Sequence, residues 1–66
     1  MKPAIQVWSD GPMVYCMSPS GTKWPDGYFH TTGLARARVS RMIAGEVASY
    51  DIDGRRPIFT RRKVNN

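Results

Sequence analysis

The sequence predicts a small α+β domain with a β-hairpin at each end and one basic helix between them. Three observations predict this fold. β-Rich runs flank an Asp-Gly turn near the N-terminus, an apolar stripe recurs with helical period in the middle, and a second Asp-Gly turn lies near the C-terminus. A chain of 66 residues forms one domain and buries only about 60% of its unfolded surface. Its Trp, Tyr and Phe side chains are therefore expected in the core.

The N-terminal part combines one clear hairpin with one ambiguous segment. The β-formers on either side of an Asp-Gly-Pro turn predict a hairpin over residues 4–17. Residues 18–22 are rich in Ser, Pro and Gly and predict a loop. Residues 25–32 fit two structures, a short helix that begins at their proline or a second hairpin that repeats an earlier Trp-x-Asp-Gly pattern.

The strongest single element is a helix over residues 35–44. Its apolar positions, spaced for one helical face, are Ala35, Val39, Met42 and Ile43. The remaining surface carries small and cationic residues, namely Arg36, Ala37, Arg38, Ser40, Arg41 and Ala44. Gly45 is expected to end the helix in a left-handed conformation, and Gly33 suits a sharp corner before it. Small residues between arginines allow such a helix to approach the base edges of DNA closely.

The C-terminal segment is predicted to be a hairpin around Asp53-Gly54, with strands over residues 49–52 and 57–60. Pro57 lacks an amide donor, so the second strand is expected at the edge of a sheet. Cations lie at the tip and after the second strand, at Arg55, Arg56, Arg61, Arg62 and Lys63. Such a hairpin can reach phosphates or the minor groove.

Charge favours a polyanionic partner. Ten Lys and Arg oppose five Asp and Glu, which gives a net charge of +5, and most of the cations are arginine. A basic surface on a small domain most often binds nucleic acid. One cysteine, Cys16, and one histidine, His30, cannot form a disulfide or a tetrahedral zinc site. No spacing of nucleophile, base or phosphate-binding glycines predicts an enzyme or a cofactor.

Several segments at fixed spacing resemble the winged helix-turn-helix of phage excisionases and MerR-type regulators. They are TGLARARVSRMI at residues 32–43, GEV at 45–47, IDGRR at 52–56 and RRKV at 61–64. In that family the matching segments form the recognition helix, the turn after it, the wing and the strand that follows. Ala35 stands where the family has a serine cap, so the helix is expected to begin without its usual side-chain cap.

The resemblance implies a winged helix-turn-helix with an extra N-terminal hairpin. It divides the chain into a hairpin and loop (1–22), a helix-turn-helix region (23–48) and a wing with a basic tail (49–64). It implies an accessory factor in recombination or transcription that binds duplex DNA in a paired or cooperative manner, with a recombinase or another host or phage protein as a further partner. The expected DNA-contacting residues are Arg36, Arg38, Ser40, Arg41, Arg55, Arg56, Arg61, Arg62 and Lys63.

Two alternatives stay open. If the Asp-Gly sites all form hairpins, the chain is a sheet-based binder of single-stranded nucleic acid, in which exposed aromatic residues stack on unpaired bases. The candidates for stacking are Trp8, Tyr15, Trp24 and Tyr28. The other alternative is a phage-type protein that occludes a host protein through its cationic surface. The chain has no apolar run of about 18 residues and no hydrophobic leader segment, so a cytoplasmic protein is expected.

Overall fold

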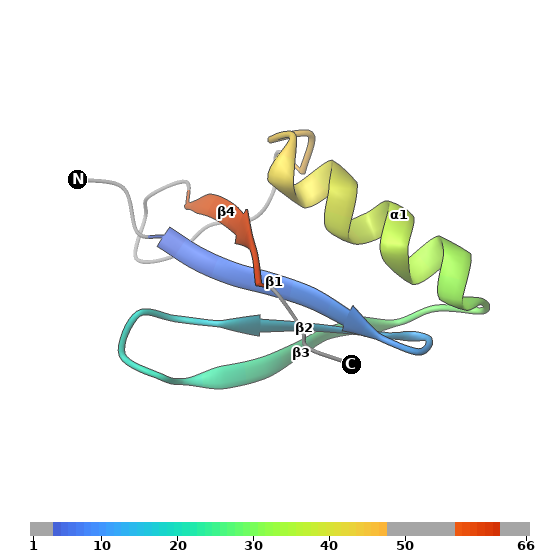
Figure 1. Ribbon diagram of the computed structural model, residues 1–66, viewed down its shortest axis with the longest axis horizontal. Coiled ribbons are helices and arrows are strands. Elements are labelled where there is room, and N and C mark those ends of the chain that lie inside the picture. Colours follow the sequence, from blue (N-terminus) through green and yellow to red (C-terminus); the bar gives the residue numbers. More distant parts are fainter. Residues whose placement is uncertain (1–3, 48–56, 63–66) are drawn as a thin grey trace.

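Four strands form one mixed sheet in the order β3-β2-β1-β4, and helix α1 covers one face of it (Figure 1). The computed structural model describes residues 4–47 and 57–62. The elements are β1 (Ala4–Asp10), β2 (Met13–Met17), β3 (Lys23–Tyr28), α1 (Thr32–Ile43) and β4 (Ile58–Arg61). β1 pairs antiparallel with β2, and β2 antiparallel with β3, whereas β4 runs parallel to β1.

The predicted hairpin over residues 4–17 is confirmed. Asp10 pairs with Met13, so the turn between β1 and β2 contains only two residues. Gly11 has φ +58°, a conformation that glycine adopts without steric cost. This tight turn fixes the register of the whole strand pair.

The register places two neighbouring cross-strand pairs on opposite faces of the sheet. Val7 lies opposite Cys16, and both are fully buried beneath α1. Trp8 lies opposite Tyr15 in the next position. Because successive side chains alternate between the faces of a strand, Trp8 and Tyr15 lie on the face that α1 does not cover.

Neither structure expected for residues 25–32 is correct, because residues 25–28 belong to strand β3, which contains a bulge. The pairing shifts between Val14 and Tyr15, which lie opposite Gly27 and Pro25, so Asp26 is the extra residue. Pro25 removes a backbone donor, but β3 is an edge strand and that donor is not needed for a further ladder.

Helix α1 starts earlier than predicted and has a side-chain cap. The hydroxyl of Thr31 accepts a hydrogen bond from the backbone N–H of Leu34 at 3.1 Å. The expectations that the helix starts at Ala35 and lacks a cap are therefore wrong. Its predicted end is confirmed, because Gly45 has φ +78° and its N–H donates to the carbonyl of Met42.

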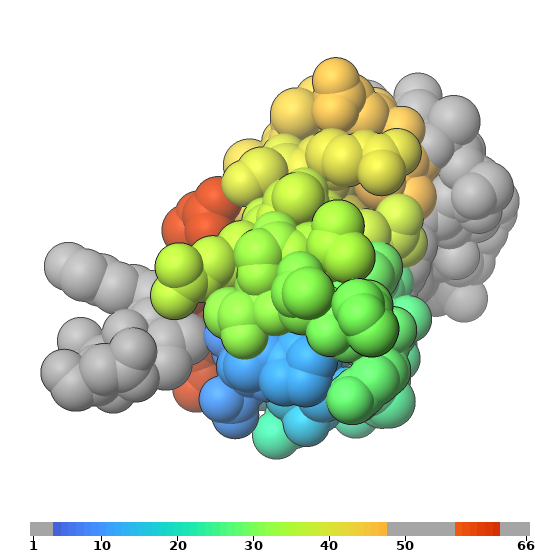
Figure 2. All heavy atoms as spheres, turned by 90° about the vertical axis from the view of Figure 1, so that its right-hand side faces the viewer, coloured from blue at the N-terminus to red at the C-terminus, as the bar shows by residue number. Residues whose placement is uncertain are grey.

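The core lies between α1 and the sheet and is built mainly from aliphatic side chains. Its buried residues are Ile5, Val7, Val14, Cys16, Ala35, Val39, Met42 and Phe59. Trp24, Phe29 and Val47 pack partly buried at its margin. The predicted helix stripe is confirmed at three of its four positions, whereas Ile43 is 36% exposed. In Figure 2, seen from the end at which α1 begins, the helix rests directly on the strands and β4 lies along one flank.

The winged helix-turn-helix fold is wrong. Among the described residues, 44% lie in strands and 24% in one helix, whereas that fold needs several helices. Residues 23–28, expected within the helix-turn-helix region, form β3. Gly33 lies inside the first turn of α1 and makes no corner.

The C-terminal strand has a partner that the predicted terminal hairpin does not include. β4 pairs with β1, which lies some fifty residues earlier in the chain, and Ile5 faces Phe59 in this register. Among the described residues β4 lies at an edge of the sheet, which agrees with the expectation from Pro57. The turn at Asp53-Gly54 and the strand predicted before it lie outside the described residues.

Candidate nucleic-acid interface

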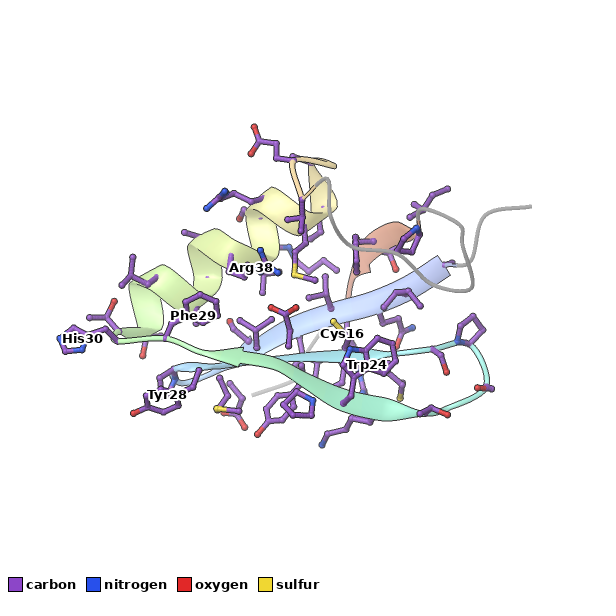
Figure 3. The ribbon with its side chains drawn as sticks, turned by 180° about the vertical axis from the view of Figure 1, so that it is seen from behind. Cys16, Trp24, Tyr28, Phe29, His30 and Arg38 are labelled. Atoms are coloured by element: carbon purple, nitrogen blue, oxygen red, sulfur yellow. The ribbon has the colours of Figure 1, made fainter. Side chains whose placement is uncertain are left out.

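The open face of the sheet, on the side away from α1, carries the aromatic and cationic cluster of the molecule. We call this cluster the platform and define it as Trp8, Tyr15, Lys23 and Arg62. Its side chains come from β1, β2 and β3 and from the residue that follows β4. Tyr28 lies on the same side at the other end of β3, as Figure 3 shows. Its side chain is 74% exposed.

The centre of the platform is a stacked aromatic pair. The ring centroids of Trp8 and Tyr15 are 5.8 Å apart, and the ring planes are inclined by 27°. This offset geometry is the one that aromatic quadrupoles favour. The hairpin register produces it, because these two residues face each other across the ladder between β1 and β2.

Cations lie against both rings. The Lys23 ammonium is 4.8 Å from the Tyr15 centroid and 5.9 Å from the Trp8 centroid. The Arg62 guanidinium carbon is 4.7 Å from the Trp8 centroid. Both separations to the nearer ring suit a cation–π interaction. Together with Tyr15 these side chains leave Trp8 only 9% exposed, although Trp8 does not belong to the core beneath α1.

The exposed side of α1 forms a second basic surface, on the opposite side of the molecule from the platform. Arg36, Ser40 and Arg41 are all exposed there. Arg61 joins them from β4, since its guanidinium donates a hydrogen bond to the Ser40 hydroxyl at 3.3 Å. Four of the residues predicted to contact DNA are therefore on one side of the molecule.

Arg38 does not belong to that exposed surface, because its guanidinium is paired with a carboxylate of the sheet, and its predicted role as a base-reading residue stays a prediction. Its Nε donates to Asp26 Oδ2 at 2.9 Å, and its Nη2 donates to Oδ1 at 3.2 Å. The Asp26 side chain is 4% exposed and that of Arg38 is 25% exposed. Figure 3 shows Arg38 reaching from α1 toward the sheet. The bulge in β3 turns Asp26 toward the helix, so this bidentate pair fastens α1 to the edge of the sheet.

Of the remaining predicted DNA contacts, Arg62 alone lies among the described residues. Arg62, expected beside Arg61, lies on the platform, because consecutive residues of an extended segment point to opposite faces. Arg55, Arg56 and Lys63 lie outside the described residues. Lys23 was not among the predicted contacts. Its position beside Tyr15 depends on the pairing of β3 with β2, which no local sequence pattern indicates.

Other kinds of site find no support in the part of the chain that is described. Residues 4–47 and 57–62 contain no group of three or more His, Cys, Asp or Glu side chains placed to hold a metal ion. No helix among these residues has the length and apolar character needed to cross a membrane. Cys16 is buried beneath α1 and, as the single cysteine of the sequence, forms no disulfide within the chain.

Comparisons with protein-family models, with curated protein sequences and with solved structures each found no match. The resemblance of residues 32–64 to excisionases and MerR-type regulators therefore stays a prediction from sequence. Any functional proposal depends on the geometry and chemistry of this chain.

Proposed function

We propose that the protein binds single-stranded nucleic acid on the open face of its sheet. The observation that carries this proposal is the platform, where two cations lie against a stacked aromatic pair on the face of the sheet opposite α1. Binders of single strands combine these two features, because bases stack on aromatic rings while cations follow the phosphates. A protein-docking surface would need the cations, but it would not need a stacked aromatic pair beneath them.

Binding exchanges one set of contacts for another. In the free protein, Lys23 and Arg62 lie over the rings of Tyr15 and Trp8. An incoming base takes the place of a cation over a ring, and the displaced side chain pairs with the phosphate of the same or the next nucleotide. Both side chains are long and flexible, so this exchange needs no movement of the backbone.

Titration of fluorescent single-stranded oligonucleotides tests the proposal. Tyr15→Ala should weaken binding by about 5- to 150-fold, which corresponds to ~1–3 kcal/mol per stacked base. Tyr15→Phe is the matched control, because it keeps the ring and should retain affinity near that of the wild type. An affinity unchanged by Tyr15→Ala, or no binding at about 50 mM salt, would overturn the proposal.

Tryptophan fluorescence provides a second readout of the same surface. Trp24 packs against the core on the covered side, so the Trp24→Phe variant leaves Trp8 as the sole tryptophan. A bound strand should quench this remaining emission as it displaces Arg62 from the ring. The Trp8→Phe variant, which keeps Trp24 alone, should show little change on the same titration.

The exposed side of α1 supports a second candidate function, duplex DNA binding. There Arg36, Arg41 and Arg61 surround Ser40 and two exposed alanines, which leaves the helix backbone accessible to a groove. A variant with Arg36→Ala and Arg41→Ala should lose duplex binding and keep single-strand binding. Tyr15→Ala should have the opposite effect, so the two candidates are separable in one set of proteins.

A further inference from the structure

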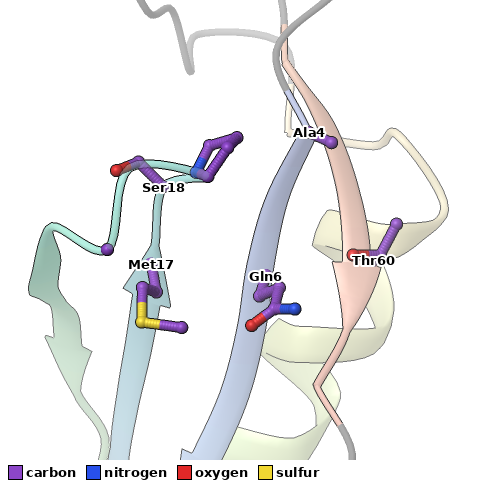
Figure 4. A pocket seen from close by; sticks show the side chains of 7 residues that line it. Ala4, Gln6, Met17, Ser18 and Thr60 are labelled. Carbon is purple, nitrogen blue, oxygen red and sulfur yellow. The ribbon is translucent and has the colours of Figure 1, made fainter.

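A groove lies beside the platform on the same face of the sheet. It has a volume of about 280 Å³ and lies between the loop after β2 and strands β1 and β4 (Figure 4). Gln6 and Thr60, neighbours in the register of β1 and β4, form its floor. Met17 and Pro19 supply apolar walls. None of the residues that line it is charged, so its chemistry suits neither a phosphate nor a metal ion.

The polar group best placed to recognise a ligand in the groove is the amide of Gln6. Figure 4 shows its side chain between Met17 and Thr60. No hydrogen bond joins this amide to another of the described residues. A primary amide offers one acceptor and two donor hydrogens in a single plane. A planar heterocycle with an adjacent donor and acceptor on its edge matches that pattern.

The groove and the platform are continuous. Gln6 and Trp8 are two residues apart on β1 and therefore share a face. Arg62 bridges the two features, because its guanidinium lies over the Trp8 ring while Nη1 is 4.0 Å from the Met17 sulfur. A strand whose base stacks at the platform thus brings its neighbouring base to the groove.

We propose that the groove holds one unpaired base next to the stacked one, and that Gln6 reads its edge with a preference for adenine. Resting on the proposed function, this inference adds a base-recognition site to a surface that otherwise binds any sequence. The Gln6 carbonyl accepts from the adenine N6 amino group, and its NH₂ donates to N7, as in the bidentate Gln–adenine pairing. The walls formed by Met17 and Pro19 contact the faces of the ring.

Affinities for short homopolymers of each base test the inference, in deoxyribose and in ribose form. The wild type should bind oligoadenylate about tenfold more tightly than oligouridylate or oligothymidylate, a value within the range for one bidentate pair. Gln6→Leu keeps the size of the side chain but removes both hydrogen-bonding groups. It should lose the preference for adenine while its affinity for pyrimidine homopolymers and its melting midpoint stay unchanged.

Asp10→Asn is the matched control, because Asp10 is exposed on the same strand at the end distant from the groove. It should keep the wild-type preference for adenine. Tighter binding of the ribose series would identify RNA as the strand, and tighter binding of the deoxyribose series DNA. Binding without base preference, or a preference that survives Gln6→Leu, would overturn the inference and leave the proposed function intact. No binding of any homopolymer would instead overturn the proposed function, and the inference with it.

Discussion

The two faces of the sheet differ in chemistry although the same strands build both. Beneath α1 the strands present Ile5, Val7, Val14 and Phe59, all buried in one apolar core. On the open face the same strands present Trp8 and Tyr15 beneath two cations. Aliphatic residues thus form most of the core, whereas the stacked pair of Trp8 and Tyr15 lies on the face opposite α1.

This division teaches that size does not decide which side chains form the core. The sequence suggested that so short a chain would use its aromatic residues there. Trp24 does pack at the margin of the core, but Trp8 is covered by Tyr15, Lys23 and Arg62 on the other side of the sheet. Long side chains shield Trp8 from water, and these can move away when a ligand arrives.

The largest expected effect is on stability, and it comes from comparing two methionines that lie on opposite faces of the sheet. Met42 is fully buried in the core, so Met42→Ala should lower the free energy of unfolding by about 2–5 kcal/mol. A domain of this size has a total stability of about 3–10 kcal/mol, so this variant is expected to be largely unfolded when warmed. Met17→Ala, on the open face, should cost about 1 kcal/mol or less. Urea denaturation followed by circular dichroism measures both, and equal losses would contradict the division between the faces.

The next largest effect concerns the ion pair that fastens α1 to β3. Arg38→Ala leaves the Asp26 carboxylate almost fully buried and unpaired, and should cost about 3 kcal/mol. Arg36→Ala, two residues earlier on the exposed side, should change stability by less than about 0.5 kcal/mol. The double variant Asp26→Ala with Arg38→Ala should recover part of the loss, because no charge is left buried.

The same variants test the role that the sequence predicted for Arg38. A base-reading Arg38 would leave stability unchanged on substitution and would lower discrimination between duplex sequences. If Arg38 instead holds α1 to β3, its substitution should lower stability strongly. Discrimination between duplex sequences should then be unchanged at a temperature where the variant is folded.

Local chemistry made several features predictable. The Asp-Gly turn and the alternation around it predicted the hairpin over residues 4–17, and the hairpin register alone places Trp8 opposite Tyr15. The apolar spacing and Gly45 predicted the body and end of α1. Thr31 was also a readable cap, three residues before the Leu34 amide that it accepts from, but the expected start of the helix at Ala35 obscured it.

Features that depend on distant partners were not predictable. Pro25 and Gly27 are unusual in a strand, and only pairing with β2 makes their segment one. β4 pairs with β1 at the opposite end of the chain. The predicted C-terminal hairpin did not include this pairing, because a turn signal indicates only the neighbouring strand. The platform shares this property, because Lys23 and Arg62 reach the aromatic pair only through these pairings. Arg38 could not be separated from its neighbours, since the bulge that turns Asp26 toward it is not visible in the sequence.

A smaller loss of stability is expected from a change at the start of α1, the helix that covers one face of the sheet. Thr31→Ala removes the hydroxyl that accepts from Leu34 N–H and should cost about 1 kcal/mol. Thr31→Ser keeps an accepting hydroxyl at the same position and should be nearly neutral. Because the cap lies away from the platform, neither variant should change single-strand affinity in the folded protein. Thermal melting beside an oligonucleotide titration measures both quantities, and an affinity loss in Thr31→Ala would show that the two faces are coupled.

Substitution of Lys23 in the platform should have the smallest effect on stability but a clear effect on binding. Lys23 is exposed, so Lys23→Gln should change the free energy of unfolding by less than about 0.5 kcal/mol. If its ammonium leaves the Tyr15 ring to neutralise one phosphate, the variant should lower the slope of log affinity against log salt by about 0.7 for a single strand. Arg36→Gln, an equal loss of charge on the far side of the molecule, should leave that slope unchanged. Equal changes in both variants would mean that net charge alone attracts the strand, and the difference between the two faces would then have no part in binding.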